Sequence, residues 1–386
     1  MLKLSSDIIR FKNFLINTRT GDSFEVDEKT SRLIDFKAIN RTEENSSLLD
    51  TMIDNNIIVD TAYDKEKNFF HLQWHLLNAC NLRCKHCYDW KNKTQTLNIK
   101  QMFKVYDDFV FFVKNVGAQA EISLTGGEPT LFKDLIPLIE YIKSRDVFAQ
   151  IYILSNGYNL FSDELLECCI KHNVGVQISL DGLEEKHDEI RGTGAFAKSI
   201  ATIKQLISKG ISTTVHCVLM KRNIDGVAEF IRFLDPMGLS RINFSTLIPI
   251  GPGAAEAAAT PQELKKCMEM IVEMQSTTKA RIIGERPLWA LVGGSGICPI
   301  GDKTLTVDAA GNMMPCRRLP MVMGNVLEDN LLEVWLKNDF LNKMRDKKKN
   351  LEKCGTCKFL ERCGGCRAMA AAVTGNPLAA DPYCWL

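Results

Sequence analysis

Three cysteines lie close together at one point of the chain. Cys80, Cys84 and Cys87 form a C-x3-C-x2-C arrangement directly after a predicted strand. Three thiolates on one short loop can bind three irons of a cubane iron–sulfur cluster, which leaves the fourth iron without a protein thiolate. A catalytic metal requires an open coordination position, whereas a structural site is closed. We therefore expect a catalytic iron–sulfur cluster here, with a structural zinc site as the alternative.

Polar and glycine-containing motifs follow the next predicted strands. Gly126 and Gly127 would let the backbone approach a ligand closely, and Glu128 offers a carboxylate for an ammonium group. Similar short motifs occur farther along the chain, at Ser155-Asn156-Gly157, Ser179-Leu180-Asp181-Gly182, His187 and Arg191-Gly192. Each alone is ordinary turn chemistry. Because the carboxyl ends of parallel strands meet at one rim, together they predict a shared site there.

A second group of cysteines lies in the last quarter of the chain, at Cys298, Cys316, Cys354, Cys357, Cys363, Cys366 and Cys384. The chain has fourteen cysteines and begins with no signal-peptide pattern, so disulfides are not expected. Clustered thiols in a reducing compartment are typical metal ligands. Two auxiliary iron–sulfur clusters and a structural zinc ribbon are the two interpretations. The other four cysteines lie in apolar stretches and are expected in the core, at Cys168, Cys169, Cys217 and Cys267.

From residue 70 onward, predicted strands alternate with predicted helices. The strands are expected at residues 70–77, 121–125, 150–155, 174–181, 212–220 and 241–248. The helices are expected at residues 99–116, 132–144, 162–172, 196–209, 224–236 and 261–276. Such alternation predicts parallel strands joined by crossover helices. The predicted fold class is therefore α/β, with a partial (β/α)6 barrel as its core.

Three regions are expected along the chain. Residues 1–68 form a small N-terminal α+β module, with a hairpin about Thr20-Gly21-Asp22, a helix over 31–39, and then a helix followed by a strand. Residues 69–260 form the partial barrel. Residues 261–386 form a bridging helix and a loop-rich, cysteine-rich extension, with helical stretches at 329–346 and 364–373.

Composition limits the class of partner. Hydrophobic residues make up 45% of the chain and charged residues 25%, which is typical of a globular protein. The net charge of +1 gives no electrostatic reason to expect nucleic acid or an anionic membrane as partner. No apolar run reaches the length that spans a bilayer. We expect a cytoplasmic protein.

The stretch from about residue 70 to 250 resembles the radical S-adenosylmethionine (SAM) superfamily. The resemblance rests on the cysteine triad with Tyr88 after it, on the GGEP motif at 126–129, and on the SNG and SLDG motifs. It implies that the open iron of a 4Fe–4S cluster binds the methionine part of SAM. It further implies that Gly126, Gly127 and Glu128 hold the ammonium group, that Ser155 and Asn156 approach the nucleoside, that Ser179 contacts the ribose, and that Arg191 contacts the carboxylate.

The second cysteine group resembles the SPASM extension of a subset of these enzymes. The resemblance assigns the distal auxiliary cluster to Cys354, Cys357, Cys363 and Cys384, and the cluster nearer the substrate to Cys298, Cys316 and Cys366. The nearer cluster then has three thiolates. Some relatives have a further cysteine shortly after the first position, where this chain has residues 299–303 with Asp302 as the one plausible oxygen ligand.

The substrate class stays open between two groups of relatives. One group modifies ribosomally made peptides, and the N-terminal module could bind an extended leader by strand addition. The other group modifies tetrapyrroles in heme and heme d1 biosynthesis, and the tail over 363–384 resembles theirs. A non-catalytic iron–sulfur sensor is a third alternative, although it would not need the SAM-side residues. The resemblance also implies an electron donor such as flavodoxin or ferredoxin.

Overall fold

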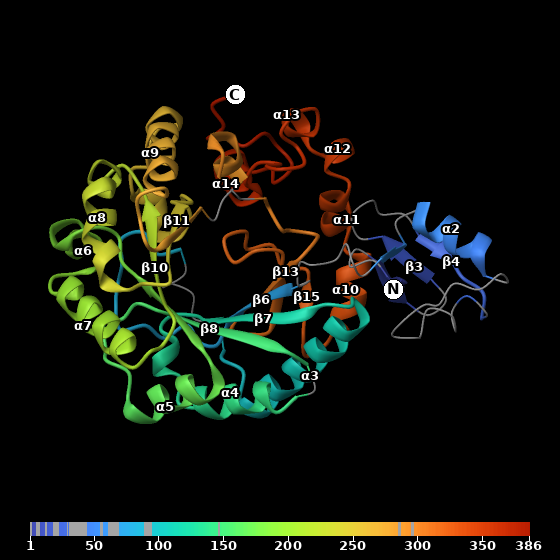
Figure 1. Ribbon diagram of the computed structural model, residues 1–386, viewed down its shortest axis with the longest axis horizontal. Coiled ribbons are helices and arrows are strands. Elements are labelled where there is room, and N and C mark those ends of the chain that lie inside the picture. The colour runs from blue at the N-terminus through green and yellow to red at the C-terminus, as the bar shows by residue number, and fades with distance from the viewer. Residues whose placement is uncertain are drawn as a thin grey trace.

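The computed structural model describes residues 2–4, 8–11, 14–17, 23–28, 30, 45–54, 57–60, 69–88, 95–145, 147–284, 287–294 and 297–386. Its centre is a curved sheet with the strand order β12-β11-β10-β9-β8-β7-β6-β13-β14-β15 (Figure 1). Six neighbouring parallel strands run through its middle: β6 (Phe69–His75), β7 (Gln119–Thr125), β8 (Ala149–Ser155), β9 (Gly175–Ser179), β10 (Thr213–Leu219) and β11 (Arg241–Thr246). These match the six predicted strands, so the partial barrel is confirmed.

Helices cover the outer face of this sheet (Figure 1). They are α3 (Ile99–Asn115), α4 (Leu135–Lys143), α5 (Asp163–His172), α6 (Glu184–Arg191), α7 (Ala195–Ser208), α8 (Val227–Leu234) and α9 (Pro261–Met274). Side-chain caps explain several starts. Asn98 and Gln101 form a capping box on α3, and Thr260 and Glu263 form one on α9. Helix α6 is the one element of this layer that the sequence pattern did not predict.

The strands alternate between two environments. On β6, Phe70, Leu72 and Trp74 are buried against the helices, whereas His71 and Gln73 line the inside of the barrel. This period of two follows from strand geometry. The four cysteines expected in the core are buried there, which confirms that expectation: Cys168, Cys169, Cys217 and Cys267. Polar side chains therefore collect in the lumen because each strand sends every second residue inward.

Two further parallel strands extend the predicted six. β12 (Arg281–Gly284) pairs with β11, and β13 (Thr304–Val307) pairs with β6. β14 (Asn312–Met314) and β15 (Gly324–Asn325) then continue antiparallel from β13. The prediction of a loop-rich C-terminal extension was therefore incomplete, since residues 261–386 supply both edges of the sheet. The strands are too short for their alternation to show in the sequence.

The rest of the C-terminal region includes the short helices η5 (Pro287–Val292), α10 (Leu331–Lys337), α11 (Asp339–Arg345), α12 (Lys347–Asn350), α13 (Glu352–Gly355) and α14 (Arg367–Thr374). Helix α10 lies beside α3, whereas α13 and α14 lie above the open side of the sheet (Figure 1). The predicted helix over 329–346 is broken at Asn338, whose side chain accepts hydrogen bonds from Phe340 and Leu341 and so starts α11. Helix α14 begins at Arg367 because Gly364 and Gly365 both have positive φ.

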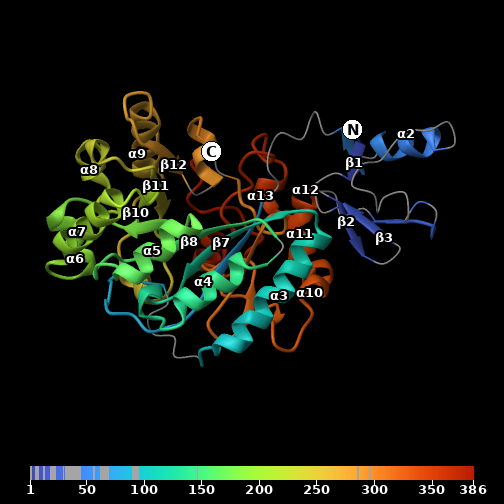
Figure 2. The same ribbon diagram turned by 60° about the horizontal axis from the view of Figure 1, so that its bottom comes forward.

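The described part of the N-terminal module contains two small antiparallel sheets and a helix (Figure 2). β1 (Leu2–Leu4) pairs with β5 (Ile58–Asp60), and β3 (Phe14–Asn17) lies between β2 (Ile8–Phe11) and β4 (Ser23–Glu25). Helix α2 (Ser46–Asp54) contributes Leu49 and Met52 to a separate small core. The predicted hairpin corresponds to β3 and β4. Its turn at 20–22 and the predicted helix over 31–39 lie outside the described residues.

Candidate active site

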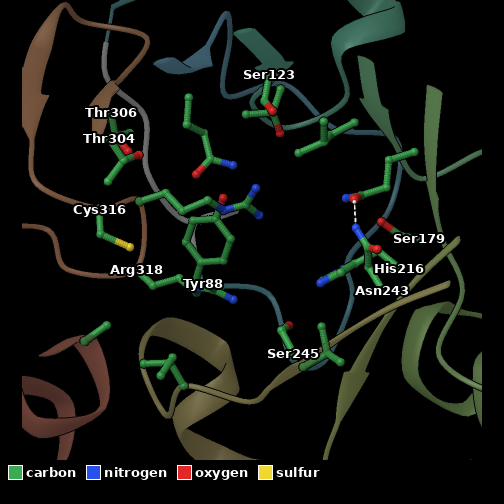
Figure 3. A pocket seen from close by; sticks show the side chains of 18 of the residues that line it. Tyr88, Ser123, Ser179, His216, Asn243, Ser245, Thr304, Thr306, Cys316 and Arg318 are labelled. Atoms are coloured by element: carbon green, nitrogen blue, oxygen red, sulfur yellow. Dashed lines mark hydrogen bonds between the residues drawn. The ribbon is translucent and has the colours of Figure 1, made fainter. Parts of the chain in front are cut away.

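A cavity of about 520 Å³ opens at the carboxyl ends of the parallel strands. Cys80, Cys84 and Cys87 line one part of it, and a second set of cysteines lines another: Cys298, Cys316 and Cys366. The cavity wall also includes the strand-end residues Ser155, Asn156, Ser179 and Arg191. Tyr88, Ser179 and Cys316 can be seen around it in Figure 3. The structure thus brings together residues that the sequence motifs placed at one rim.

The first cysteine loop is fixed by contacts from the residue after β8 and from the last residue of α6. The Nδ2 of Asn156 donates to the Asn81 side chain at 2.7 Å and lies 3.8 Å from the Cys80 Sγ. The Arg191 guanidinium lies 3.8 Å from the Cys84 Sγ. Burial raises the pKa of the Cys84 thiol to about 11, against the lowering effect of Arg191. Loading of a cluster on this loop therefore releases protons from thiols.

The two glycines of the GGEP motif approach this same loop. The backbone N–H of Gly127 donates to the Leu77 carbonyl at 2.7 Å, and that of Glu128 to the Ala79 carbonyl at 2.9 Å. A Cβ on Gly126 would lie 2.3 Å from the Leu77 oxygen, and one on Gly127 would lie 2.1 Å from the Ala79 oxygen. The sequence predicted that these glycines let the backbone approach a ligand. In the structure they let the end of β7 pack against the residues that lead into the cysteine loop.

Glu128 is almost completely buried, with 1% of its surface exposed. Its carboxylate accepts hydrogen bonds from the Ser155 Oγ and the Asn156 backbone N–H, both at 2.8 Å, and from Thr130. Burial raises the pKa of this carboxyl, opposed by the hydrogen bond from Asn156. Glu128 therefore ties the end of β7 to the end of β8, and its predicted contact with an ammonium group stays a prediction.

A buried ion pair that the sequence did not reveal lies behind the cysteine loop. The Arg191 Nε donates to Asp181 at 2.7 Å, and the His86 Nε2 lies 3.2 Å from the same carboxylate oxygen. The other oxygen accepts from the Val218 backbone N–H at 2.9 Å. Burial raises the pKa of Asp181, but Arg191, His86 and His187 together outweigh it and hold that pKa well below its ordinary value, with Arg191 the largest of the three. Arg191 is thus oriented toward Cys84 by Asp181.

This ion pair was difficult to predict because its members come from separate segments. His86 lies on the cysteine loop, Asp181 follows β9, and Arg191 is the last residue of α6. One local signal was present, since Glu184 and Glu185 occupy the first turn of α6 and Gly192 follows its last residue. Acidic residues at a helix start and glycine after its end are typical boundaries.

His187 is a buried neutral histidine, and it predicts a pH effect on stability. Its Nδ1 accepts from the Asp181 backbone N–H at 3.1 Å. Burial, assisted by the Arg191 charge, lowers the pKa of His187 from 6.5 to about 4. The folded state therefore binds this proton less readily than the unfolded state, so the stabilisation is complete above pH 6.5 and is lost as the pH falls toward 4.

We expect wild type to lose about 2 kcal/mol more of its unfolding free energy between pH 8 and pH 5 than His187→Asn, whose amide oxygen can accept the same hydrogen bond without titrating. Urea unfolding of both proteins at the two pH values measures this difference. Equal losses in the two proteins would show that His187 is protonated in the folded state.

The second cysteine group forms two sets in space. Cys298 is close enough to Cys316 and Cys366 for their charges to raise its pKa, although burial is the main cause. Burial raises the pKa of Cys363 to about 12, with smaller contributions from Asp381, Cys384 and Cys354. Cys357 follows Cys354 in one turn, its N–H donating to the Cys354 carbonyl at 3.2 Å. Cys298 thus lies near Cys316 and Cys366, and Cys363 lies near Cys354 and Cys384, while the assignment of each thiol to a cluster stays a prediction of the resemblance.

Asp302, the one oxygen ligand considered for the nearer set, is not among the described residues that line the cavity. It lies instead beside Arg345, whose pKa it raises against the dominant lowering effect of burial. The nearer set thus presents three thiols to the cavity: Cys298, Cys316 and Cys366.

Every helix in the described part of the chain is too short or too polar to cross a bilayer.

Comparison with protein families matches residues 74–234 to the radical SAM superfamily and residues 298–358 to SPASM, an iron–sulfur cluster-binding domain. The first match includes Cys80, Cys84 and Cys87, and the second includes Cys298, Cys316, Cys354 and Cys357. The zinc interpretations of both groups are therefore replaced by iron–sulfur clusters.

Individual relatives point to two kinds of reaction. The chain is 26% identical over 348 residues to the AdoMet-dependent heme synthase of Methanosarcina barkeri, covering 81% of this chain and 95% of that protein. It is 28% identical over 333 residues to the mycofactocin maturase MftC of Mycobacterium tuberculosis, covering 81% of this chain and 82% of that protein.

Among solved structures, the fold is similar to that of Streptococcus suis SuiB, solved with S-adenosylmethionine and with its precursor peptide SuiA. The TM-score is 0.69 at 17% identity, and all of both chains is covered. At this identity the likeness concerns the fold alone. The chain belongs to the radical SAM superfamily and carries a SPASM domain, and it is an enzyme whose cofactors are SAM, a 4Fe–4S cluster and auxiliary iron–sulfur clusters.

Proposed function

We propose that this enzyme oxidatively modifies a ribosomally made peptide. The observation that carries the proposal is that the similarity in fold to SuiB covers the whole of this chain. The likeness to SuiB, a protein solved with its precursor peptide, extends over the whole chain and thus includes the N-terminal module. The sequence matches to the heme synthase and to MftC cover 81% of the chain. The module is therefore the region that favours a peptide over a tetrapyrrole.

The residues around the first cysteine loop would hold the cofactors. Cys80, Cys84 and Cys87 would bind the 4Fe–4S cluster, which when bound supplies the electron that cleaves SAM to methionine and a hydrogen-abstracting 5′-deoxyadenosyl radical. Gly126, Gly127 and Glu128 would hold the ammonium group of SAM, Ser155 and Asn156 the nucleoside, Ser179 the ribose and Arg191 the carboxylate. Arg191 uses its Nε for Asp181, so its terminal nitrogens are the ones that face the cysteine loop.

The two SPASM sets would hold the auxiliary clusters. Cys354, Cys357, Cys363 and Cys384 would bind the distal cluster, and Cys298, Cys316 and Cys366 the nearer one. Because the nearer set lines the same cavity as the first cysteine loop, its cluster would lie beside the substrate. A flavodoxin or ferredoxin would deliver the electrons. The substrate would then enter between Cys80, Cys84 and Cys87 on one side and Cys298, Cys316 and Cys366 on the other.

In the N-terminal module, β2 and β4 are the outer strands of the three-stranded sheet. An outer strand has backbone N–H and C=O groups on one side that can pair with an added strand. A leader segment of the substrate peptide would add there as an extended strand.

A second candidate function is modification of a tetrapyrrole side chain. Its support is the match to the heme synthase, which covers 95% of that protein. In that case the N-terminal module would serve as a cap for the barrel. The two functions differ in whether the module is needed.

The test uses anaerobically reconstituted enzyme with SAM and dithionite, assayed for 5′-deoxyadenosine. We expect the host's peptide fraction to raise its production several-fold and the tetrapyrrole fraction to leave it unchanged. Deletion of residues 1–68 should abolish the stimulation. The iron content and the unstimulated rate of the deleted protein are the control for an intact barrel. Stimulation by tetrapyrroles alone would contradict the peptide proposal.

A further inference from the structure

The cavity between the first cysteine loop and the nearer SPASM set is lined by more positively charged than negatively charged side chains. The described residues that line it include one carboxylate, Glu121, and five arginines: Arg191, Arg241, Arg317, Arg318 and Arg367. An uncompensated charge in a partly buried site is costly. The arginines therefore need partners, and the partner of each decides whether any charge is left for a substrate.

Each cysteine set has a cation of its own. Arg191 lies 3.8 Å from the Cys84 Sγ. Arg367, which is fully buried, lies 3.8 Å from the Cys354 Sγ and also donates to the Pro377 and Ala379 carbonyls. Lys347 donates to the Cys298 carbonyl at 3.2 Å and is the cation that acts on its thiol, lowering a pKa that burial raises. The anionic clusters thus have counter-charges that do not involve Arg317.

Arg241 is also accounted for, at the opposite end of the lumen. It hydrogen-bonds the Tyr152 hydroxyl and lowers the pKa of that group, which burial raises. Glu121 lies beside the same tyrosine and raises its pKa. Since Arg241 is the first residue of β11, this group lies away from the carboxyl ends of the strands. The one carboxylate in the described lining is therefore already next to an arginine.

Arg191, Arg241 and Arg367 have the partners just described, and Arg318 also has an interaction within the protein, so Arg317 is the arginine that remains. Its guanidinium lies over the Tyr88 ring, 4.7 Å from the ring centre. Among the described residues, none accepts a hydrogen bond from its buried Nε, and no carboxylate pairs with it. Arg318 follows it in the loop after Cys316 and lines the same cavity. Figure 3 shows Tyr88 and Arg318 both extending into this space.

We propose that Arg317, together with Arg318, forms an anion subsite that binds a carboxylate of the substrate. A guanidinium binds a carboxylate through two parallel hydrogen bonds, and stacking on Tyr88 would hold the plane of the Arg317 guanidinium for that purpose. Tyr88 follows the first cysteine loop and Arg317 follows Cys316. The subsite therefore holds the substrate between the radical source and the nearer auxiliary set.

This subsite rests on the proposed function and narrows its substrate. For a peptide, the carboxylate belongs to an acidic side chain or to the C-terminus. A tetrapyrrole propionate has the same chemistry, so the subsite and the peptide proposal can fail separately.

The first test is arginine footprinting of the reconstituted holoenzyme with SAM, using phenylglyoxal and mass spectrometry. The probe is N-acetyl-glutamate N-methylamide, and its neutral isostere N-acetyl-glutamine N-methylamide is the control. We expect the carboxylate at saturation to slow modification of Arg317 and Arg318 by about threefold or more, while the amide does not. Arg232, exposed on α8, should react at the same rate in every sample. Equal protection by both compounds, or by neither, would overturn the subsite.

The second test distinguishes the subsite from the peptide proposal. Carboxyl groups of the peptide fraction are methyl-esterified, and 5′-deoxyadenosine formation is compared with that for the untreated fraction. Loss of stimulation on esterification supports the subsite, whereas equal stimulation overturns it and leaves the peptide proposal intact. If coproporphyrin stimulates but its methyl ester does not, the subsite stands and the peptide proposal fails.

A variant locates the effect. Arg317→Gln should raise the substrate concentration for half-maximal stimulation by about tenfold to a hundredfold, the range expected for a lost charged hydrogen bond. Arg232→Gln should leave it unchanged. An unchanged value for both variants would also overturn the subsite.

Discussion

Replacing Gly127 by alanine is expected to lower the rate of 5′-deoxyadenosine formation by about a hundredfold or more. The new Cβ would lie 2.1 Å from the Ala79 carbonyl oxygen, closer than such atoms approach in proteins. Both partners are backbone, so neither can rotate away. The hydrogen bonds from Gly127 to Leu77 and from Glu128 to Ala79 would break, and the end of β7 would separate from the cysteine loop.

The size of the expected effect follows from what Glu128 holds. Its carboxylate fixes Ser155 and Asn156, and Asn156 in turn contacts Cys80. A displacement of about 1 Å at a reacting centre costs roughly a hundredfold in rate. One backbone shift therefore disturbs three of the motifs that surround the proposed SAM site.

The control for this variant is Gly226→Ala. Gly226 precedes α8 with an ordinary negative φ, and an added Cβ there meets nothing within 4 Å. It should keep wild-type iron content and wild-type 5′-deoxyadenosine formation under dithionite. If Gly127→Ala kept a rate within threefold of wild type, the junction between β7 and the cysteine loop would not be needed for SAM cleavage.

The six parallel strands could be predicted because each is a run of apolar and β-branched residues that ends at a glycine or a polar motif. The strand ends then predicted where Cys80, Ser155 and Ser179 would meet. β12 and β13 have four residues each, too few to show alternation, and they are defined by pairing with β11 and β6. Only the folded sheet therefore shows that the C-terminal region forms part of the barrel.

The charged residues of the site illustrate the same limit. Residue types and spacing indicated Arg191 as functional, but its partner Asp181 was only a member of a turn motif. Arg317 drew no attention in the sequence because an arginine after a cysteine has no distinctive pattern. Its position over Tyr88 depends on two segments that lie more than two hundred residues apart. Ion pairs and stacked groups of this kind are fixed by tertiary structure, which local periodicity does not encode.

Replacing Asp181 by asparagine is expected to destabilise the cluster-free protein by about 3–5 kcal/mol, the cost of leaving one member of a buried ion pair without its partner. The asparagine can still accept a hydrogen bond from the Val218 N–H, so the loss of unfolding free energy measures the effect of removing the negative charge. Arg191 would stay buried beside Cys84 and His86 with no carboxylate to balance it. The shift of the urea midpoint, converted with the measured m-value, gives the free energy.

The double variant Asp181→Leu/Arg191→Met is the matched control, because it removes both charges and replaces them with apolar side chains. It should be less destabilised than Asp181→Asn, since a buried ion pair loses most when one partner remains.

The thiols of Cys84 and Cys87 also act on Arg191 and raise its pKa, though less than Asp181 does. A cluster makes those thiols permanently anionic. The penalty of Asp181→Asn should therefore be smaller in the cluster-loaded protein than in the cluster-free one. Equal penalties would show that Asp181 alone balances the charge of Arg191. The position of Arg191, 3.8 Å from the Cys84 Sγ, would then contribute nothing to cluster binding.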